Sequence, residues 1–133
     1  MTLSEVKPKM MLTLLIALIA ILLLVCGQTL LKLGLNDIGG ISLFDGNPVG
    51  SLLGLLGTPW ILVGFVLYGV SAVLWLDVLS KLDFSMAFPM VSLTYVFSLI
   101  IGRFVFHETV GPERILGVLL ILGGLFFVIR SGR

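Results

Sequence analysis

The chain has 133 residues, of which 59% are hydrophobic and 11% are charged, and its formal net charge is +1. So few charged side chains could not cover a water-soluble domain of this size, and so small a net charge provides no field to attract nucleic acid. The single cysteine, Cys26, excludes an internal disulfide and a cysteine-based metal site. The composition therefore indicates an integral membrane protein, and we expect no metal, cofactor or nucleic-acid partner.

Four segments have the length and apolar character needed to cross a bilayer, which takes roughly 20 residues. The first follows Lys7 and Lys9 but is too long for a signal peptide, so we expect it to be retained. The predicted fold is all-α, a single transmembrane domain over residues 1–133 with four helices over about 10–34, 59–80, 85–106 and 112–129.

The longest connection is predicted outside the cytoplasm, over residues 35–58, and it contains no Lys or Arg. Its apolar part, residues 49–57, either lies in the membrane interface or lengthens the second helix, and the sequence leaves both possibilities open. Within the third helix, Pro89 removes one backbone hydrogen bond and predicts a kink or a free carbonyl.

Basic residues near the helix ends predict the orientation. With four spans, both termini share a side with the connection between the second and third helices. That side carries Lys7, Lys9, Lys81, Arg130 and Arg133. The other side carries Lys32, Arg103 and Arg114. We therefore expect both termini in the cytoplasm. Asp77 lies four residues before Lys81, a spacing more typical of an interfacial ion pair than of a binding site.

Polar side chains gather at the predicted outer ends of the first and third helices. Gln28 and Lys32 are one turn apart on one face of the first helix. Arg103, His107 and Glu108 cluster where the third helix is expected to end. Lys32 and Arg103 either extend to the lipid headgroups or face one cavity as a basic clamp for a phosphate.

Semi-polar stripes follow the middle helices. Ser92 and Tyr95 lie on one side of the third helix beyond Pro89, and Tyr68 and Trp75 share a face of the second. Small side chains also allow close helix packing, so the third-helix stripe predicts either a packing face or the wall of a transport path. Trp75 is also suited to an interfacial anchor.

The fourth helix carries glycines that allow another backbone to approach. Gly117 and Gly124 are seven residues apart and therefore share a face, and Leu120 and Ile121 lie between them. This face predicts either dimerisation or packing within the subunit. Four helices are too few to enclose a pathway, so we expect a homodimer or a heterodimer with a related small subunit.

Together these motifs resemble the drug/metabolite transporter superfamily. The marks are Gly27-Gln28 with Lys32, Leu74-Trp75-Leu76, the run Ser85–Leu93, Glu108, and Gly117 with Gly124. The resemblance covers the chain except for residues 35–58. It implies an EamA-like or SMR-like bundle and a transporter rather than an enzyme.

One branch of that superfamily, the small multidrug resistance proteins, depends on a glutamate in the first helix. Counted back from Lys32, that position is Leu24 here. Export of small organic cations or polyamines is nevertheless kept as the alternative, with an aromatic site formed by Tyr68, Trp75 and Tyr95.

The other branch comprises paired small subunits that flip undecaprenyl-phosphate-aminoarabinose across the bacterial inner membrane, and it is the more similar. The resemblance implies that Lys32 and Arg103 hold the phosphate. It also implies that the sugar meets Gln28, Ser92, Tyr95 and Glu108. Asp77 and the long connection depart from that pattern. A third reading, a membrane subunit that only positions a glycosyltransferase, would need no polar stripe.

Overall fold

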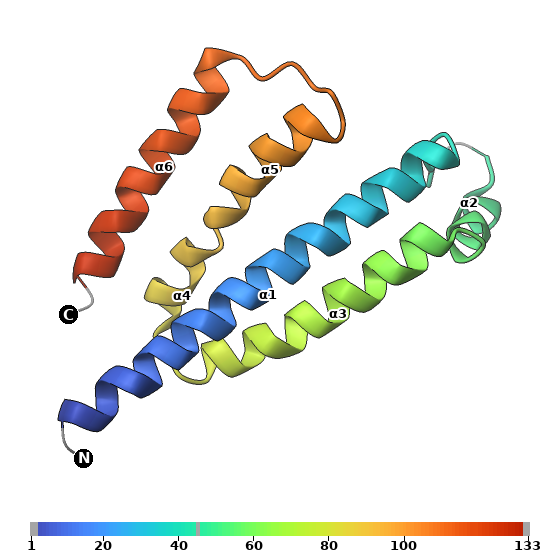
Figure 1. The fold of residues 1–133 in the computed structure, drawn as a ribbon. Helices are drawn as coiled ribbons and strands as arrows, with labels where there is room; N and C mark the ends of the chain where they lie inside the picture. The colour runs from blue at the N-terminus through green and yellow to red at the C-terminus, as the bar shows by residue number, and fades with distance from the viewer. Residues whose placement is uncertain (1–2, 45, 132–133) are drawn as a thin grey trace.

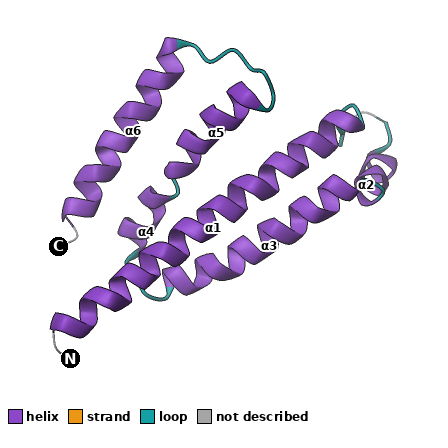
Figure 2. Cartoon of the chain, in the orientation of Figure 1, coloured by secondary structure: helices purple, strands orange, loops and turns teal. Residues whose placement is uncertain are grey.

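The structure is a computed structural model that describes residues 3–44 and 46–131. Within these ranges it contains helices and connections but no β-strand (Figure 2). The helices are α1 (Leu3–Asp37), α2 (Pro48–Leu56), α3 (Pro59–Leu79), α4 (Phe84–Met90), α5 (Leu93–Phe104) and α6 (Pro112–Ser131) (Figure 1). Four stretches are long and apolar enough to cross a membrane: Pro8–Asp37, Pro59–Leu79, Phe84–Phe104 and Pro112–Ser131. The prediction of an all-α membrane protein with four spans is thus confirmed.

Helices α1 and α3 run antiparallel side by side and form the tightest pair in the bundle (Figure 1). They meet at Gly27 and Gly64, where a Cβ added to either glycine would lie 2.9 Å from the carbonyl oxygen of the other. Farther along, the Ser71 hydroxyl donates to the Ala20 carbonyl over 2.8 Å. Small residues and a cross-helix hydrogen bond are the usual means by which helices associate in lipid, where burial of apolar surface gives little gain.

The third membrane segment is interrupted between α4 and α5. Pro89 lies inside α4 and has no N–H to donate to the preceding turn. Across the interruption the backbone uses tighter three-residue turns, because the Ser92 N–H donates to the Pro89 carbonyl and the Tyr95 N–H to the Ser92 carbonyl, each over 3.0 Å. The predicted kink at Pro89 is therefore confirmed, and it separates the two halves of this segment.

The apolar stretch that precedes α3 forms a separate helix, α2. The Asn47 side chain accepts a hydrogen bond from the Gly50 N–H over 2.9 Å, which caps the first turn of α2. Gly57 and Thr58 then separate α2 from α3. Of the two possibilities left open by the sequence, lengthening of the second helix does not occur.

The buried core lies in the half of the bundle nearer the described ends of the chain. It joins α1, α3, α4 and α6 with the connection after α3, through Ala17, Ile21, Val78, Leu82, Ala87, Met90 and Leu125. Leu125 is the only residue of α6 that is buried. At the opposite end α1, α5 and α6 diverge (Figure 1), and the space between them is a cavity.

Candidate functional site

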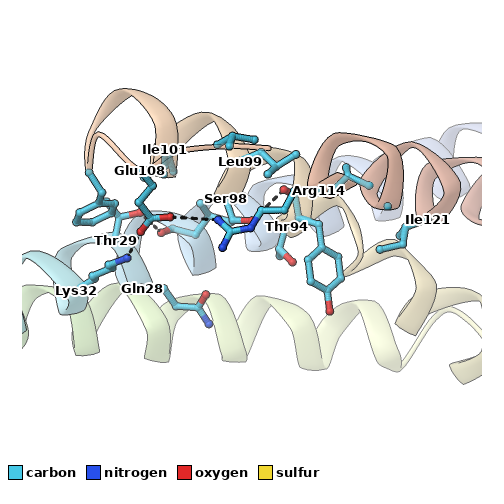
Figure 3. Close-up of a pocket in the computed structure, with 17 residues that line it drawn as sticks. Gln28, Thr29, Lys32, Thr94, Ser98, Leu99, Ile101, Glu108, Arg114 and Ile121 are labelled. Carbon is cyan, nitrogen blue, oxygen red and sulfur yellow. Dashed lines mark hydrogen bonds and ion pairs between the residues drawn. The ribbon is translucent and has the colours of Figure 1, made fainter. Parts of the chain in front are cut away.

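A cavity of about 570 Å³ opens between α1, α5, α6 and the connection that joins α5 to α6. Its wall is mainly apolar, but polar side chains converge on it from all of these elements (Figure 3). The polar side chains that line it include those of Gln28, Lys32, Tyr95, Ser98, Glu108 and Arg114. A cavity of this size, largely apolar with a few convergent polar groups, is typical of a small-molecule site.

The polar face of α1 lines the cavity as one surface. Gln28 and Lys32 are four residues apart, so their side chains stack on the same side of the helix, and both line the cavity (Figure 3). The Gly27–Gly64 contact holds this part of α1 against α3 on its other side. The tight α1–α3 pair therefore fixes the direction in which Gln28 and Lys32 point.

The Lys32 ammonium is held by two groups around the cavity mouth. It forms an ion pair and hydrogen bond with Glu108 Oε1, and it lies over the Phe106 ring, 4.5 Å from the ring centroid. The other carboxylate oxygen, Glu108 Oε2, is 4.0 Å from Arg114 Nη1. One carboxylate thus lies between two cations contributed by α1 and α6.

The backbone after α5 places Glu108 at this position. The Glu108 N–H donates back to the Gly102 carbonyl over 2.8 Å, across a turn in which His107 adopts the left-handed conformation with φ of 54°. Gly102 has no Cβ, and an added one would lie 3.0 Å from Glu108 Oε2. The carboxylate therefore rests against α5 where a larger residue at position 102 would require it to shift by a few tenths of an ångström.

The Glu108 carboxyl lies outside the membrane-spanning segments, and its pKa is lowered from the ordinary value of 4.5. The hydrogen bond from Lys32 is the main cause, followed by the charge of Lys32, with a smaller contribution from Arg114; partial desolvation opposes them. A lowered pKa means that the pairing is fully present above the ordinary value and is lost only as pH falls through the lowered one. Glu108 is consequently ionised throughout the physiological range.

Arg103 does not belong to this cavity. Its side chain is exposed on α5, and the second cation beside Glu108 is Arg114, at the start of α6. The sequence predicts a third helix that continues to Phe106. In the structure α5 ends at Phe104 and the chain then folds back. Arg114 was placed at a helix end by sequence, but its approach to Lys32 depends on that turn.

The hydroxyl stripe of the third segment is only partly directed into the cavity. Tyr95 and Ser98 line it together with Thr94, a neighbour that the stripe did not include. Ser92 does not line it, because it lies in the tight turn between α4 and α5. Its Oγ is buried and has no hydrogen-bond partner within the described part of the chain.

We predict that Ser92→Ala stabilises the folded protein by about 1 kcal/mol, because a buried hydroxyl without a partner carries an uncompensated desolvation cost. The measurement is the thermal unfolding of the purified protein in detergent. Ser98→Ala is the matched control, since the Ser98 hydroxyl is exposed and already donates to the Tyr95 carbonyl over 2.9 Å. A lower stability of Ser92→Ala would show that this hydroxyl has a partner.

Tyr68 and Trp75 lie apart from the charged cavity. They line a second, smaller cavity of about 250 Å³ between α1, α3 and α4, together with Phe88. Tyr95, the third member of the predicted aromatic site, lines the first cavity instead. The aromatic residues are thus divided between two places, and no carboxylate lines the second one.

Asp77 forms an ion pair with Lys81 at the end of α3. The distance from Asp77 Oδ2 to Lys81 Nζ is 2.7 Å, and neither side chain lines either cavity. The predicted ion pair between residues four apart is confirmed. It is an exposed pair, and such pairs contribute little to stability.

The small-residue face of α6 is divided between the cavity and open surface. Gly117 and Ile121 line the cavity. Leu120 is 70% exposed, and a Cβ added at Gly124 would meet nothing within 4 Å. Within the described chain, Leu120 and Gly124 therefore have no close packing partner.

Comparison with known proteins gives a consistent set of relatives. The chain is 33% identical over 110 residues, 83% of its length and 95% of the relative, to a Pseudomonas fluorescens protein named "Probable 4-amino-4-deoxy-L-arabinose-phosphoundecaprenol flippase subunit ArnE". Proteins of the same name from Pseudomonas savastanoi pv. phaseolicola and Enterobacter are 37% and 38% identical over 56% and 52% of the chain. These two alignments span 66% and 64% of the relatives. No protein-family model and no solved structure matches the chain.

Proposed function

The chain belongs to the family of ArnE-type flippase subunits, and we propose that it carries a polyprenyl phosphate bearing an amino sugar across the bacterial inner membrane. Moving such a lipid requires a polar surface that shields the phosphate and sugar while the isoprenoid chain stays in hydrocarbon. The names of the relatives support transport rather than catalysis, and we assign the chain no enzymatic role.

The charged cavity is the observation that carries this proposal. Lys32 on α1 and Arg114 on α6 provide two cations that can hold a phosphate by charge-assisted hydrogen bonds. Gln28, Tyr95 and Ser98 supply hydrogen-bonding groups for sugar hydroxyls a short distance along the same wall. The remaining lining is apolar, and the volume of about 570 Å³ suits a phosphorylated monosaccharide.

We place both termini in the cytoplasm, so that the charged cavity lies toward the outer face of the membrane. The start of α1, the end of α6 and the α3–α4 connection lie at one end of the bundle (Figure 1). Lys9, Lys81 and Arg130 support a cytoplasmic location of that end, while Arg133 lies outside the described residues.

We propose that the open side of α6 packs against a second small subunit. Leu120 and Gly124 lie on the same helix as the cavity residues Gly117 and Ile121, so a partner at α6 would also close the cavity from that side. The relatives are named as subunits, which supports an assembly. Both a homodimer and a heterodimer satisfy this geometry.

Export of organic cations is less well supported by the same geometry. A cation needs an anionic or strongly aromatic site. The carboxylate of the charged cavity is already paired with Lys32, and the aromatic cavity beside Tyr68 and Trp75 contains no carboxylate.

The test is native mass spectrometry of the protein extracted with its partners from its own membrane, with identification of the lipids that remain bound. We expect a polyprenyl phosphate carrying an amino sugar, released when synthetic polyprenyl phosphate is added in excess. Bulk phospholipid alone, together with saturable binding of an organic cation such as spermidine, would contradict the proposal and favour the exporter.

A further inference from the structure

The Glu108 carboxylate occupies the place between the two cations that a phosphate would need. Oε1 pairs with Lys32, and Oε2 lies 4.0 Å from Arg114. Figure 3 shows the three side chains meeting at one end of the cavity. A phosphate that binds both cations must therefore displace the carboxylate or lie directly beside it.

The position of Glu108 is specified by the fold around it. Its N–H donates to the Gly102 carbonyl, its carboxylate lies against Gly102, and the preceding His107 has a positive φ. Left-handed backbone is unfavourable for a side chain other than glycine. The hydrogen bond from the Glu108 N–H to the Gly102 carbonyl does not involve Lys32, so it can hold the backbone of residue 108 beside the cavity when the ion pair is broken.

When the phosphate displaces the Glu108 carboxylate from the two cations, the negative charge of the carboxylate is left without a partner. A phosphate and a carboxylate side by side repel each other, and the mainly apolar lining strengthens that repulsion relative to open water. A positive group on the bound molecule, adjacent to the phosphate, would remove it. A sugar that carries an amino group has such a positive group at neutral pH.

Resting on the function proposed above, we infer that Glu108 is the residue that selects the amino group of the lipid-linked sugar. The phosphate takes Lys32 and Arg114, and the carboxylate that they release pairs with the ammonium of the sugar. Every charged group of the site thus has a partner of opposite charge both before and after binding. A lipid whose sugar lacks the amino group leaves the carboxylate uncompensated beside the phosphate.

This exchange explains why a carboxylate lies in a site that must bind an anion. Without Glu108, Lys32 and Arg114 would attract any polyprenyl phosphate in the membrane. With Glu108, a lipid that brings only negative charge must compete with an internal anion, so the site discriminates by disfavouring the wrong ligand.

The test compares the binding of two synthetic lipids to the complex purified from membranes. One is a polyprenyl phosphate with an amino sugar, and the other carries a hydroxyl in place of the amino group. We expect the wild type to prefer the aminated lipid by about tenfold. Glu108→Gln should reduce that preference to within about twofold, mainly because the hydroxyl lipid binds more tightly.

Asp77→Asn is the matched control, since it removes a carboxylate from another exposed lysine ion pair far from the cavity; its preference should equal that of the wild type. If Glu108→Gln is not recovered folded, Glu108→Asp replaces it, and its shorter side chain should lower the preference.

Three outcomes would overturn the inference. The first is that Glu108→Gln prefers the aminated lipid as strongly as the wild type does. Where Glu108→Asp is used instead, the same result in that variant overturns the inference. The second is that Glu108→Gln binds both lipids more weakly by the same factor. Glu108 would then only position Lys32. The third is a wild type that binds both lipids equally. A wild type that binds neither lipid contradicts the proposed function itself and so is distinguished from the other outcomes.

Discussion

Replacing Lys32 with glutamine should weaken binding of a polyprenyl phosphate by about tenfold or more, and replacing Arg114 with glutamine by about threefold. A charge-assisted hydrogen bond contributes about 1.5–3 kcal/mol, and about 1.4 kcal/mol corresponds to tenfold in affinity. Lys32 should have the larger effect because its ammonium is held over the Phe106 ring and its side chain is less exposed, at 50%. The Arg114 side chain is 63% exposed, so water and salt screen its charge more strongly.

Arg103→Gln provides the control for this comparison. It removes the same charge from the same end of the bundle, but its side chain lies outside the cavity, so binding should change by less than about twofold. The measurement is a titration of the purified complex with a fluorescent polyprenyl phosphate at constant ionic strength. An equal loss in Arg103→Gln and Lys32→Gln would indicate a general surface charge effect and contradict the assignment of the phosphate site to the cavity.

The parts of the fold that depend on local chemistry were predictable from the sequence. Four apolar runs predicted four spans, because hydropathy alone determines which segments enter a bilayer. Pro89 predicted the interruption of the third span, since the missing N–H is a property of the residue itself. The spacing of Gln28 and Lys32 predicted a common face, and both residues line the cavity.

The composition of the cavity mouth was less predictable, because it depends on the conformation of one turn. A sequence reading extends the third helix through Phe106 and brings Arg103 toward Lys32. The left-handed conformation of His107 instead folds the chain back, which brings Glu108 against Gly102 and Arg114 beside it. Positive φ is uncommon even for His, which adopts it more often than most residues, so the identity of residue 107 is only a weak signal for this turn.

The division of the aromatic residues also depends on tertiary structure. Tyr68 and Trp75 share a helix face, as their spacing predicted, but that face lines the smaller cavity beside α4. Tyr95 follows the interruption after Pro89 and lines the charged cavity. Helical spacing places residues on faces, whereas the packing of each helix decides which cavity a face meets.

Replacing Gly64 with valine should separate α1 from α3 and lower the free energy of unfolding by about 2–3 kcal/mol. A Cβ at residue 64 would lie 2.9 Å from the Gly27 carbonyl oxygen and 3.0 Å from the Leu31 side chain. The contact with the carbonyl cannot be relieved by a rotamer change, because it involves backbone, so the two helices must move apart. Gln28 and Lys32 lie on the stretch of α1 that would move, and lipid binding should fall together with stability.

Gly69→Val on the same helix is the control. It introduces the same β-branched residue in place of glycine, so it measures the cost of that change to stability without the steric clash. A Cβ at residue 69 would meet nothing within 4 Å, so its effect on stability should stay within about 0.5 kcal/mol. Unfolding of both variants is followed by circular dichroism in the same detergent. Equal stability of the two variants would mean that α1 and α3 do not depend on the Gly27–Gly64 contact, and the position of the charged face of α1 would then need another cause. A selective loss of stability and lipid binding in Gly64→Val would instead link the Gly27–Gly64 contact to the placement of Lys32, the proposed phosphate ligand.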